Sequence, residues 1–171
     1  MTANGIAERR QQVKAVRVLL RVFAADFLSM FINMTLAGSR STAMRIVCLV
    51  CTVLILVTVL ADFSIKEAHD DVKNKRSIAG IYAAGVAAAV PAFLSWMILC
   101  ISVKSGNFDF YRWHKLINAP FLQYYNLIES DATSAALSSG ELKLMLLPVF
   151  LLPFAVTIPY FSTRKCGEKE K

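Results

Sequence analysis

The stretch IVCLVCTVLILVTVLA, from Ile46 to Ala61, determines the environment in which the rest of this chain folds. It contains no charged residue, no glycine and no proline. An α-helix rises about 1.5 Å per residue, so about 20 residues cross the roughly 30 Å hydrocarbon core of a bilayer. With its flanking residues the stretch reaches that length, and we expect a membrane-spanning helix over about 44–64.

The composition of the whole chain favours the same environment. Hydrophobic residues make up 56% of the 171 residues, whereas a soluble domain contains about 45–50% apolar residues. The formal net charge is +7, and the Lys and Arg residues flank the apolar blocks. Because the sequence has no basic patch interleaved with aromatic residues of the kind that binds single-stranded nucleic acid, we expect contacts with the lipid bilayer and its anionic headgroups, and no nucleic-acid partner.

Four apolar blocks predict an all-α integral membrane helix bundle with four transmembrane helices. The bundle should cover residues 22–165, with spans at about 22–38, 44–64, 78–103 and 142–161. Residues 1–21 are expected to form a basic amphipathic cytoplasmic helix that leads into the first span. Residues 65–76 should form a polar connector, and residues 166–171 a polar cytoplasmic tail.

The distribution of basic residues predicts the orientation. Thirteen of the nineteen Lys and Arg residues fall on the side of the two termini, and six fall on the other side. Cytoplasmic segments are enriched in Lys and Arg. We therefore expect a protein of the cell (cytoplasmic) membrane with both termini in the cytoplasm.

A basic stripe occupies one face of the first expected helix. Arg10, Lys14, Arg17 and Arg21 are three or four residues apart, so they share a face. The stripe is expected to face the lipid at the cytoplasmic surface. It is either the positively charged lead-in to the first span or a surface that recognises acidic lipid or a partner.

Three polar residues of the first two spans are candidates for a ligand or ion site. Asp26 and Asn33 lie in the first span, and Asp62 lies at the inner end of the second. Antiparallel neighbours with a short connection place Asp26 and Asp62 at a similar depth. A charged residue costs about 2.5–3.5 kcal/mol at the bilayer centre, so these carboxylates are either a proton or cation site or interfacial ion pairs that seat the helices.

The last two spans carry signals for close packing and for bending. Gly80, Ala84 and Ala88 are four residues apart, a spacing that lets helices approach closely in lipid. Proline inside a helix removes a hydrogen bond and kinks it. We expect a kink in the third span and a bent or broken fourth span, at Pro91, Pro148, Pro153 and Pro159.

The connection between the third and fourth spans, residues 104–141, is rich in aromatic residues. We expect one or two short amphipathic helices over residues 108–129, broken near Pro120 and lying in the membrane interface. This interfacial segment is either an anchor or a lid over a lateral ligand site in the bundle. Its interfacial residues would be Tyr111, Trp113, Tyr124 and Tyr125, and residues 130–140 would be a flexible linker.

Motifs of soluble enzymes are absent from the sequence. There is no phosphate-binding glycine loop, no GxSxG and no HExxH. We therefore expect no metal, no cofactor and no soluble-type active site. One local pattern remains, the pair of cysteines in Cys48-Leu49-Val50-Cys51.

A four-span chain of this length, with a CxxC pair near the outer end of its second span, is similar in layout to the membrane thiol oxidases of the DsbB type. The resemblance implies a thiol–quinone oxidoreductase in which Cys48 and Cys51 are the catalytic pair and quinone is the cofactor. The sequence departs from that family at two places. Arg45 precedes the pair where the family has an arginine after it, and residues 104–141 contain no second cysteine pair.

Two functional classes follow from the sequence. The first is a multi-pass membrane protein without a soluble-type active site, either an accessory subunit of a membrane complex or a small transport component. A protein partner or a homo-oligomer is expected for it. The alternative is the thiol–quinone oxidoreductase that uses Cys48 and Cys51.

Overall fold

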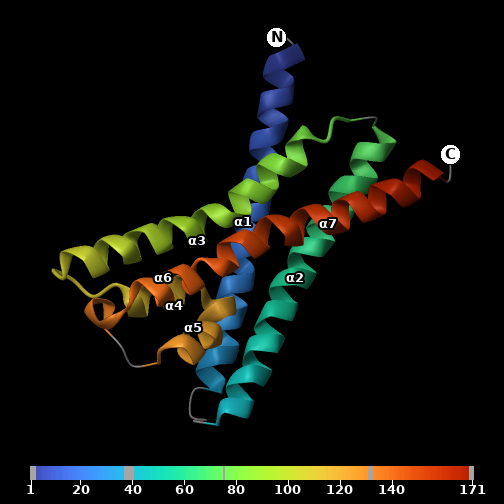
Figure 1. Cartoon of the computed structure of the whole chain (residues 1–171). Coiled ribbons are helices and arrows are strands. Elements are labelled where there is room, and N and C mark those ends of the chain that lie inside the picture. The colour runs from blue at the N-terminus through green and yellow to red at the C-terminus, as the bar shows by residue number, and fades with distance from the viewer. Residues whose placement is uncertain (1–2, 37–40, 75, 131–132, 170–171) are drawn as a thin grey trace. The chain divides into compact units, whose positions relative to one another are not determined.

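The computed structural model describes residues 3–36, 41–74, 76–130 and 133–169, with side chains from residue 11 to residue 167. All regular secondary structure of these residues is helical, which confirms the expected all-α class. Four long helices carry most of the chain (Figure 1): α1 (Ala3–Thr35), α2 (Thr42–Lys73), α3 (Ala79–Ser105) and α7 (Leu147–Lys169). Short elements lie between α3 and α7 in the chain: α4 (Tyr111–Ile117), η1 (Ala119–Phe121), α5 (Leu122–Ile128), η2 (Ser134–Ala136) and α6 (Ser139–Met145).

Among the residues that the structure describes, three helical segments are long and apolar enough to cross a membrane. They are Thr42–Lys73, Ala79–Ser105 and Ser139–Gly167. They contain the expected second and fourth spans, and the expected third span except for its first residue. Their length and composition indicate an integral membrane protein. The expected first span, residues 22–38, is not one of the three.

Helix α1 joins the expected lead-in helix and most of the expected first span in one element. Residues 6–36 contain no glycine or proline that would interrupt it. Its second half presents apolar side chains three or four residues apart on an exposed face. These are Phe23, Phe27, Phe31 and Met34.

The polar connector that we expected over residues 65–76 is wrong in its first part, because α2 continues to Lys73. The segment has no helix breaker. Glu67 and Asp71 are four residues apart, share one face, and are buried together with Ala68. The mixed charges therefore belong to an amphipathic helix, and only its outer face is exposed.

The segment after α5 is folded over residues 133–169. Ser138 caps α6: its hydroxyl accepts a hydrogen bond from the Glu141 backbone N–H at 3.3 Å, and the Glu141 carboxylate accepts one from the Ser138 N–H at 2.7 Å. The prediction of a flexible linker over residues 130–140 is therefore wrong for residues 133–140. The expected fourth span is broken between α6 and α7, just before Pro148, and α7 continues through Pro153 and Pro159.

The chain divides into two compact units. Unit 1 contains Met1–Phe23, Val57–Ala89 and Phe150–Lys171, and unit 2 contains Ala24–Leu56 and Val90–Val149. Unit 1 has an apolar core that includes Leu60, Phe63, Ile81 and Val156. Unit 2 has its own core, which includes Leu99, Tyr111, Tyr125 and Met145.

Candidate functional sites in the two units

The polar interior of unit 1 is built around the ammonium group of Lys14. This side chain is buried, and its Nζ donates hydrogen bonds to both carboxylate oxygens of Asp71, at 2.9 and 2.7 Å. The same Nζ lies 3.0 Å from Oε2 of Glu67. Gly80 on α3 leaves room for the Lys14 stem, since a Cβ at this position would lie 3.0 Å from Lys14 Cδ.

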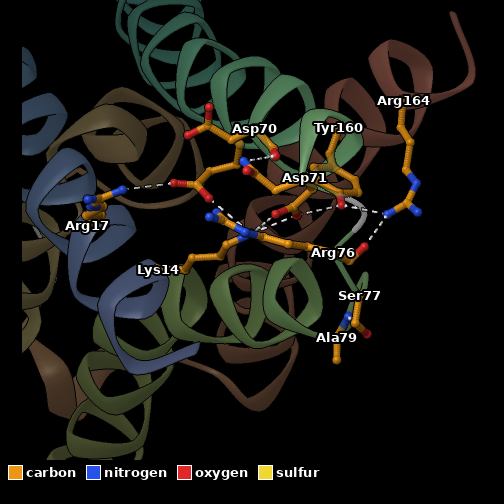
Figure 2. Close-up of polar contacts among 11 residues, drawn as sticks. Lys14, Arg17, Asp70, Asp71, Arg76, Ser77, Ala79, Tyr160 and Arg164 are labelled. Carbon is orange, nitrogen blue, oxygen red and sulfur yellow. Dashed lines mark hydrogen bonds and ion pairs between the residues drawn. The ribbon is translucent and has the colours of Figure 1, made fainter. Parts of the chain in front are cut away.

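Helices α1 and α7 complete this group of charges (Figure 2). Tyr160 Oη donates to Asp71 Oδ2 at 2.8 Å, and Arg164 donates to Tyr160 Oη at 3.1 Å. Arg17 donates to Glu67 Oε1 at 3.3 Å. Each buried carboxylate thus has a cation within hydrogen-bond distance. We call this set the Lys14 network: Lys14, Arg17, Glu67, Asp71, Tyr160 and Arg164.

The Lys14 network connects α1, α2 and α7 within unit 1. Asp71 lies about 15 Å beyond Ala61 along the helix axis, so the network is past the end of the apolar run of α2. A buried charge that loses its partner costs several kcal/mol. The arrangement can therefore hold these helices together through their charges.

The remaining predicted residues of unit 1 form ion pairs at its surface. Asp62 accepts a hydrogen bond from Arg21 at 3.1 Å and lies 2.9 Å from the Lys66 ammonium. Of the basic stripe, Lys14, Arg17 and Arg21 interact with carboxylates of α2. The side chain of Arg10 lies outside the described residues. Binding of lipid headgroups by the stripe stays a prediction.

Neutral side chains form the buried polar interior of unit 2. Three amide side chains there continue a series of hydrogen bonds that starts at Lys115, and each residue donates to the next. Lys115 Nζ donates to Asn126 Oδ1 at 3.0 Å, and Asn126 Nδ2 donates to Gln123 Oε1 at 3.3 Å. Gln123 Nε2 then donates to Asn33 Oδ1 at 2.9 Å. The last hydrogen bond of this series goes from Asn33 Nδ2 to the carbonyl oxygen of Ala119, at 3.1 Å. We call Asn33, Gln123 and Asn126 the amide chain.

A second set of polar contacts joins α2 and α3 to the short elements of unit 2. Thr52 Oγ1 donates to the Pro120 carbonyl at 2.8 Å. Ser95 Oγ lies 2.9 Å from Nδ1 of His114, and Asn118 Nδ2 donates to Ser95 Oγ at 3.3 Å. Burial lowers the pKa of His114 to about 4, although its hydrogen bond with Ser95 acts in the opposite direction. His114 is therefore neutral at physiological pH.

A pocket of about 330 Å³ adjoins the amide chain. Small-molecule sites in proteins have volumes of about 300–1,000 Å³ and combine an apolar lining with a few polar groups. The polar wall of the pocket consists of the amide chain and Arg45, which is its only charged lining residue within the described part of the chain. The rest of the lining is Met30, Met34, Leu36, Met44, Cys48, Leu116 and Leu122.

The three candidate residues for a ligand or ion site have different surroundings. Asn33 lines the pocket, Asp62 is paired in unit 1, and Asp26 lies half-buried in unit 2. No hydrogen bond or ion pair from another described residue reaches the Asp26 carboxylate. Burial is the main cause that raises the pKa of the Tyr125 hydroxyl, and Tyr124, Tyr111 and Asp26 raise this pKa further.

The four aromatic residues of the expected interfacial segment have different surroundings in unit 2. Tyr111 and Tyr125 are fully buried, whereas Trp113 is 61% exposed. The Tyr111 hydroxyl donates to the carbonyl oxygens of Tyr125 and Glu129, at 3.0 and 2.6 Å. Tyr124 donates to the Leu144 carbonyl at 3.0 Å. Location of this segment in a membrane interface stays a prediction.

The cysteines of the CxxC pair also differ in their surroundings. Cys48 is buried and lines the pocket, whereas Cys51 is exposed, and both are free thiols. The thiol of Cys48 is therefore the one that a molecule in the pocket would meet.

Comparison of the chain with protein-family models, with curated proteins and with solved structures finds no match. The pairing of Glu67 and Asp71 with Lys14 is not predicted from the sequence, and neither are the pocket residues Arg45 and Gln123. The helical period in 65–73 gives the shared face of Glu67 and Asp71. No pattern in the sequence brings Arg45 next to the amide chain.

Proposed function

We propose that this chain is a small multi-pass membrane protein that binds an amphiphilic molecule in the pocket of unit 2. It would serve as a transport component or as an accessory subunit of a membrane assembly. The observation that carries the proposal is the pocket itself, in which a methionine-rich apolar wall faces the amide chain and Arg45. Methionine is flexible and polarizable, so such a wall adapts to alkyl chains of different shape.

The chemistry of the lining supports binding more than catalysis. Amide side chains donate and accept hydrogen bonds and a guanidinium group donates them, but none of these groups exchanges protons near neutral pH. A role in holding and passing on a molecule needs no more than this. The half-buried Asp26 would be the group through which such transport is coupled to a proton or cation. Asp26→Asn should then stop uptake while membrane levels stay normal.

We further propose that α1 crosses the membrane as a fourth span and that both termini face the cytoplasm of the cell membrane. The exposed apolar face formed by Phe23, Phe27, Phe31 and Met34 supports this, since such a face is stable against lipid. The excess of Lys and Arg on the side of the termini supports the orientation. Reporter tags at the two ends should then both be inaccessible from outside intact cells.

Native mass spectrometry tests the binding proposal. The full chain, released from a mild detergent, should carry a small-molecule adduct. Met30→Trp fills the pocket and should remove the adduct. Met97→Trp changes an exposed methionine of α3 that does not line the pocket, and this variant should keep the adduct. Equal adducts in both variants, or none in the wild-type protein, would contradict the proposal.

The subunit role has a separate test. Extraction in a mild detergent should give a particle much larger than one chain, and pull-down should identify the protein that accompanies it. A clean monomer that retains the small-molecule adduct would favour an independent binding or transport protein over a subunit.

The thiol–quinone oxidoreductase is the second candidate, and it rests on the observation that Cys48 lines the pocket. Quinone would take two electrons and two protons as the Cys48 and Cys51 thiols form a disulfide. Cys48→Ser and Cys51→Ser should each abolish quinone-dependent thiol oxidation in membranes. Unchanged oxidation in both variants would exclude this function.

A further inference from the structure

Arg45 has hydrogen-bonding capacity that the described residues do not use. Its guanidinium group has five N–H donors. One hydrogen bond from its side chain is found, from Nη1 to the Asn126 carbonyl at 3.5 Å, the upper limit for such a bond. No carboxylate among the described residues forms an ion pair with it. A half-buried cation with free donors, at the wall of a pocket, is suited to an anionic group.

The amide chain next to Arg45 strengthens this preference. Each of its three side-chain oxygens accepts a hydrogen bond, from Lys115, Asn126 and Gln123 in turn. Gln123 and Asn126 each keep one side-chain N–H that these bonds do not use. The chain starts at the Lys115 ammonium, so its dipoles are fixed in one direction. The polar wall therefore offers donors and positive charge, which match the oxygens of a phosphate or carboxylate.

The position of Arg45 in the sequence points to a lipid as the source of that anion. Arg45 immediately precedes the apolar run of α2 that begins at Ile46. An arginine at the end of a membrane helix places its charge at the level of the lipid headgroups. Met34, Met44 and Leu116 in the apolar lining are exposed, so the pocket opens at the surface of the unit.

We propose that the pocket of unit 2 binds an anionic phospholipid, with the headgroup phosphate on Arg45 and the upper part of one acyl chain against the methionine-rich wall. This inference rests on the proposed function, because it names the class of the amphiphilic molecule. It also distinguishes the site from the basic stripe, which lies in α1 before the first expected span.

Photoreactive lipids test the proposal in the full-length protein. The chain is reconstituted in phosphatidylcholine vesicles that contain a small fraction of photoreactive phosphatidylglycerol or photoreactive phosphatidylcholine with the same acyl chain. Labelled positions are mapped by mass spectrometry. We expect phosphatidylglycerol to label Met30, Met34 and Leu122 about ten-fold more than phosphatidylcholine. Both lipids carry an anionic phosphate, but the choline cation of phosphatidylcholine repels the Arg45 guanidinium and cancels the net charge of the headgroup.

Variants of Arg45 separate the headgroup contact from loss of folding. Arg45→Gln should equalise the two probes, and Arg45→Lys, which keeps the charge but loses the planar fork, should retain part of the preference. Arg112→Gln, at an exposed arginine of α4 outside the pocket, should leave the preference unchanged. If all three variants lose pocket labelling equally, or if wild-type labelling concentrates on the basic stripe, the proposal is overturned.

Three outcomes of these experiments show whether this inference, the proposed function or both fail. Equal labelling of the pocket by both probes in the wild-type protein and in Arg45→Gln would overturn the headgroup contact and leave pocket binding intact. Absence of pocket labelling, together with absence of an adduct in native mass spectrometry, would overturn both. Absence of labelling with an adduct that Met30→Trp removes would mean that the occupant is not a lipid of this class.

Discussion

The two units bury polar groups in different ways. Unit 1 buries Lys14, Glu67 and Asp71, and the Lys14 ammonium lies 2.7–3.0 Å from both carboxylates. The buried polar residues of unit 2 are neutral ones in the part of the chain that the structure describes, and a pocket adjoins them. They are Ser29, Asn33, Thr52, Ser95, Ser102, His114, Asn118, Gln123 and Ser134.

This difference in buried polar groups suits the units to different roles: unit 1 to holding helices together, and unit 2 to binding a ligand. When two opposite charges are buried together and one moves away, the free energy rises, because the other charge stays desolvated without a partner. Buried amides and hydroxyls are less costly to leave unpaired, and amides keep spare N–H groups for a ligand. The Lys14 network therefore suits a fixed junction of helices, and the amide chain with Arg45 suits a site that is filled and emptied.

The largest expected effect comes from removing the cation of unit 1. Lys14→Met leaves Glu67 and Asp71 buried without their main partner, so the free energy of unfolding should fall by about 3–5 kcal/mol. Lys66→Met is the matched control, because Lys66 forms an exposed pair with Asp62, and it should cost less than about 1 kcal/mol. Unfolding in detergent measures both. Equal losses in the two variants would remove the distinction between buried and exposed charge.

Acid should affect unit 2 through His114. The pKa of His114 is lowered to about 4 in the folded chain by burial, whereas an unfolded histidine titrates near pH 6.5. Between these values the unfolded chain binds more protons than the folded chain, so stability falls as the pH falls from about 6.5 to 4. The full loss is about 3 kcal/mol.

Two histidine variants check this pH dependence. In His114→Gln the melting temperature should fall less between pH 6.5 and pH 4 than in the wild-type protein. His69→Gln changes an exposed histidine of α2 and should keep the wild-type profile. Parallel profiles for the wild-type protein and His114→Gln would show that the acid response arises elsewhere.

A smaller effect is expected where unit 2 loses one neutral hydrogen bond. Thr52→Val removes the donor to the Pro120 carbonyl and should cost about 1–3 kcal/mol, because a buried acceptor is left unsatisfied. Thr58→Val, at an exposed position of the same helix, should stay within about 0.5 kcal/mol of the wild-type protein. Hydrogen exchange over residues 111–128 should increase in Thr52→Val alone. A loss as large as that of Lys14→Met would contradict the view that neutral groups are cheaper to disrupt.

Much of the fold could be predicted from the sequence, because local properties determine it. The apolar run of Ile46–Ala61 has one stable form in lipid, a helix, and the break before Pro148 follows from the missing N–H of proline. The extension of α2 to Lys73 was not predicted. A polar connector is the expectation for such a charged segment, but Glu67 and Asp71 recur at a helical spacing, and a partner on α1 makes their burial stable.

The candidate sites were less predictable, because they depend on contacts between distant residues. The spacing of the basic stripe predicts that its residues share one face of α1, but it does not predict that this face contacts carboxylates of α2. Composition likewise gives Tyr111 and Trp113 the same environment, whereas the fold buries one and exposes the other. Arg45 joins the amide chain only through tertiary packing, so the pocket could not be derived from local patterns.

The smallest expected effect concerns the ion pairs of Asp62, and it tests whether burial is the cause of the difference between the units. The Asp62 side chain is 48% exposed, and its partners Arg21 and Lys66 are at the surface. Asp62→Asn should therefore leave the free energy of unfolding close to that of the wild-type protein, and any change should shrink further in about 1 M salt, where screening is strong. Asp71→Asn is the buried counterpart, and its larger loss should depend little on salt. If Asp62→Asn were as harmful as Asp71→Asn at both salt concentrations, charge pairing itself would fasten unit 1 and burial would add nothing to it.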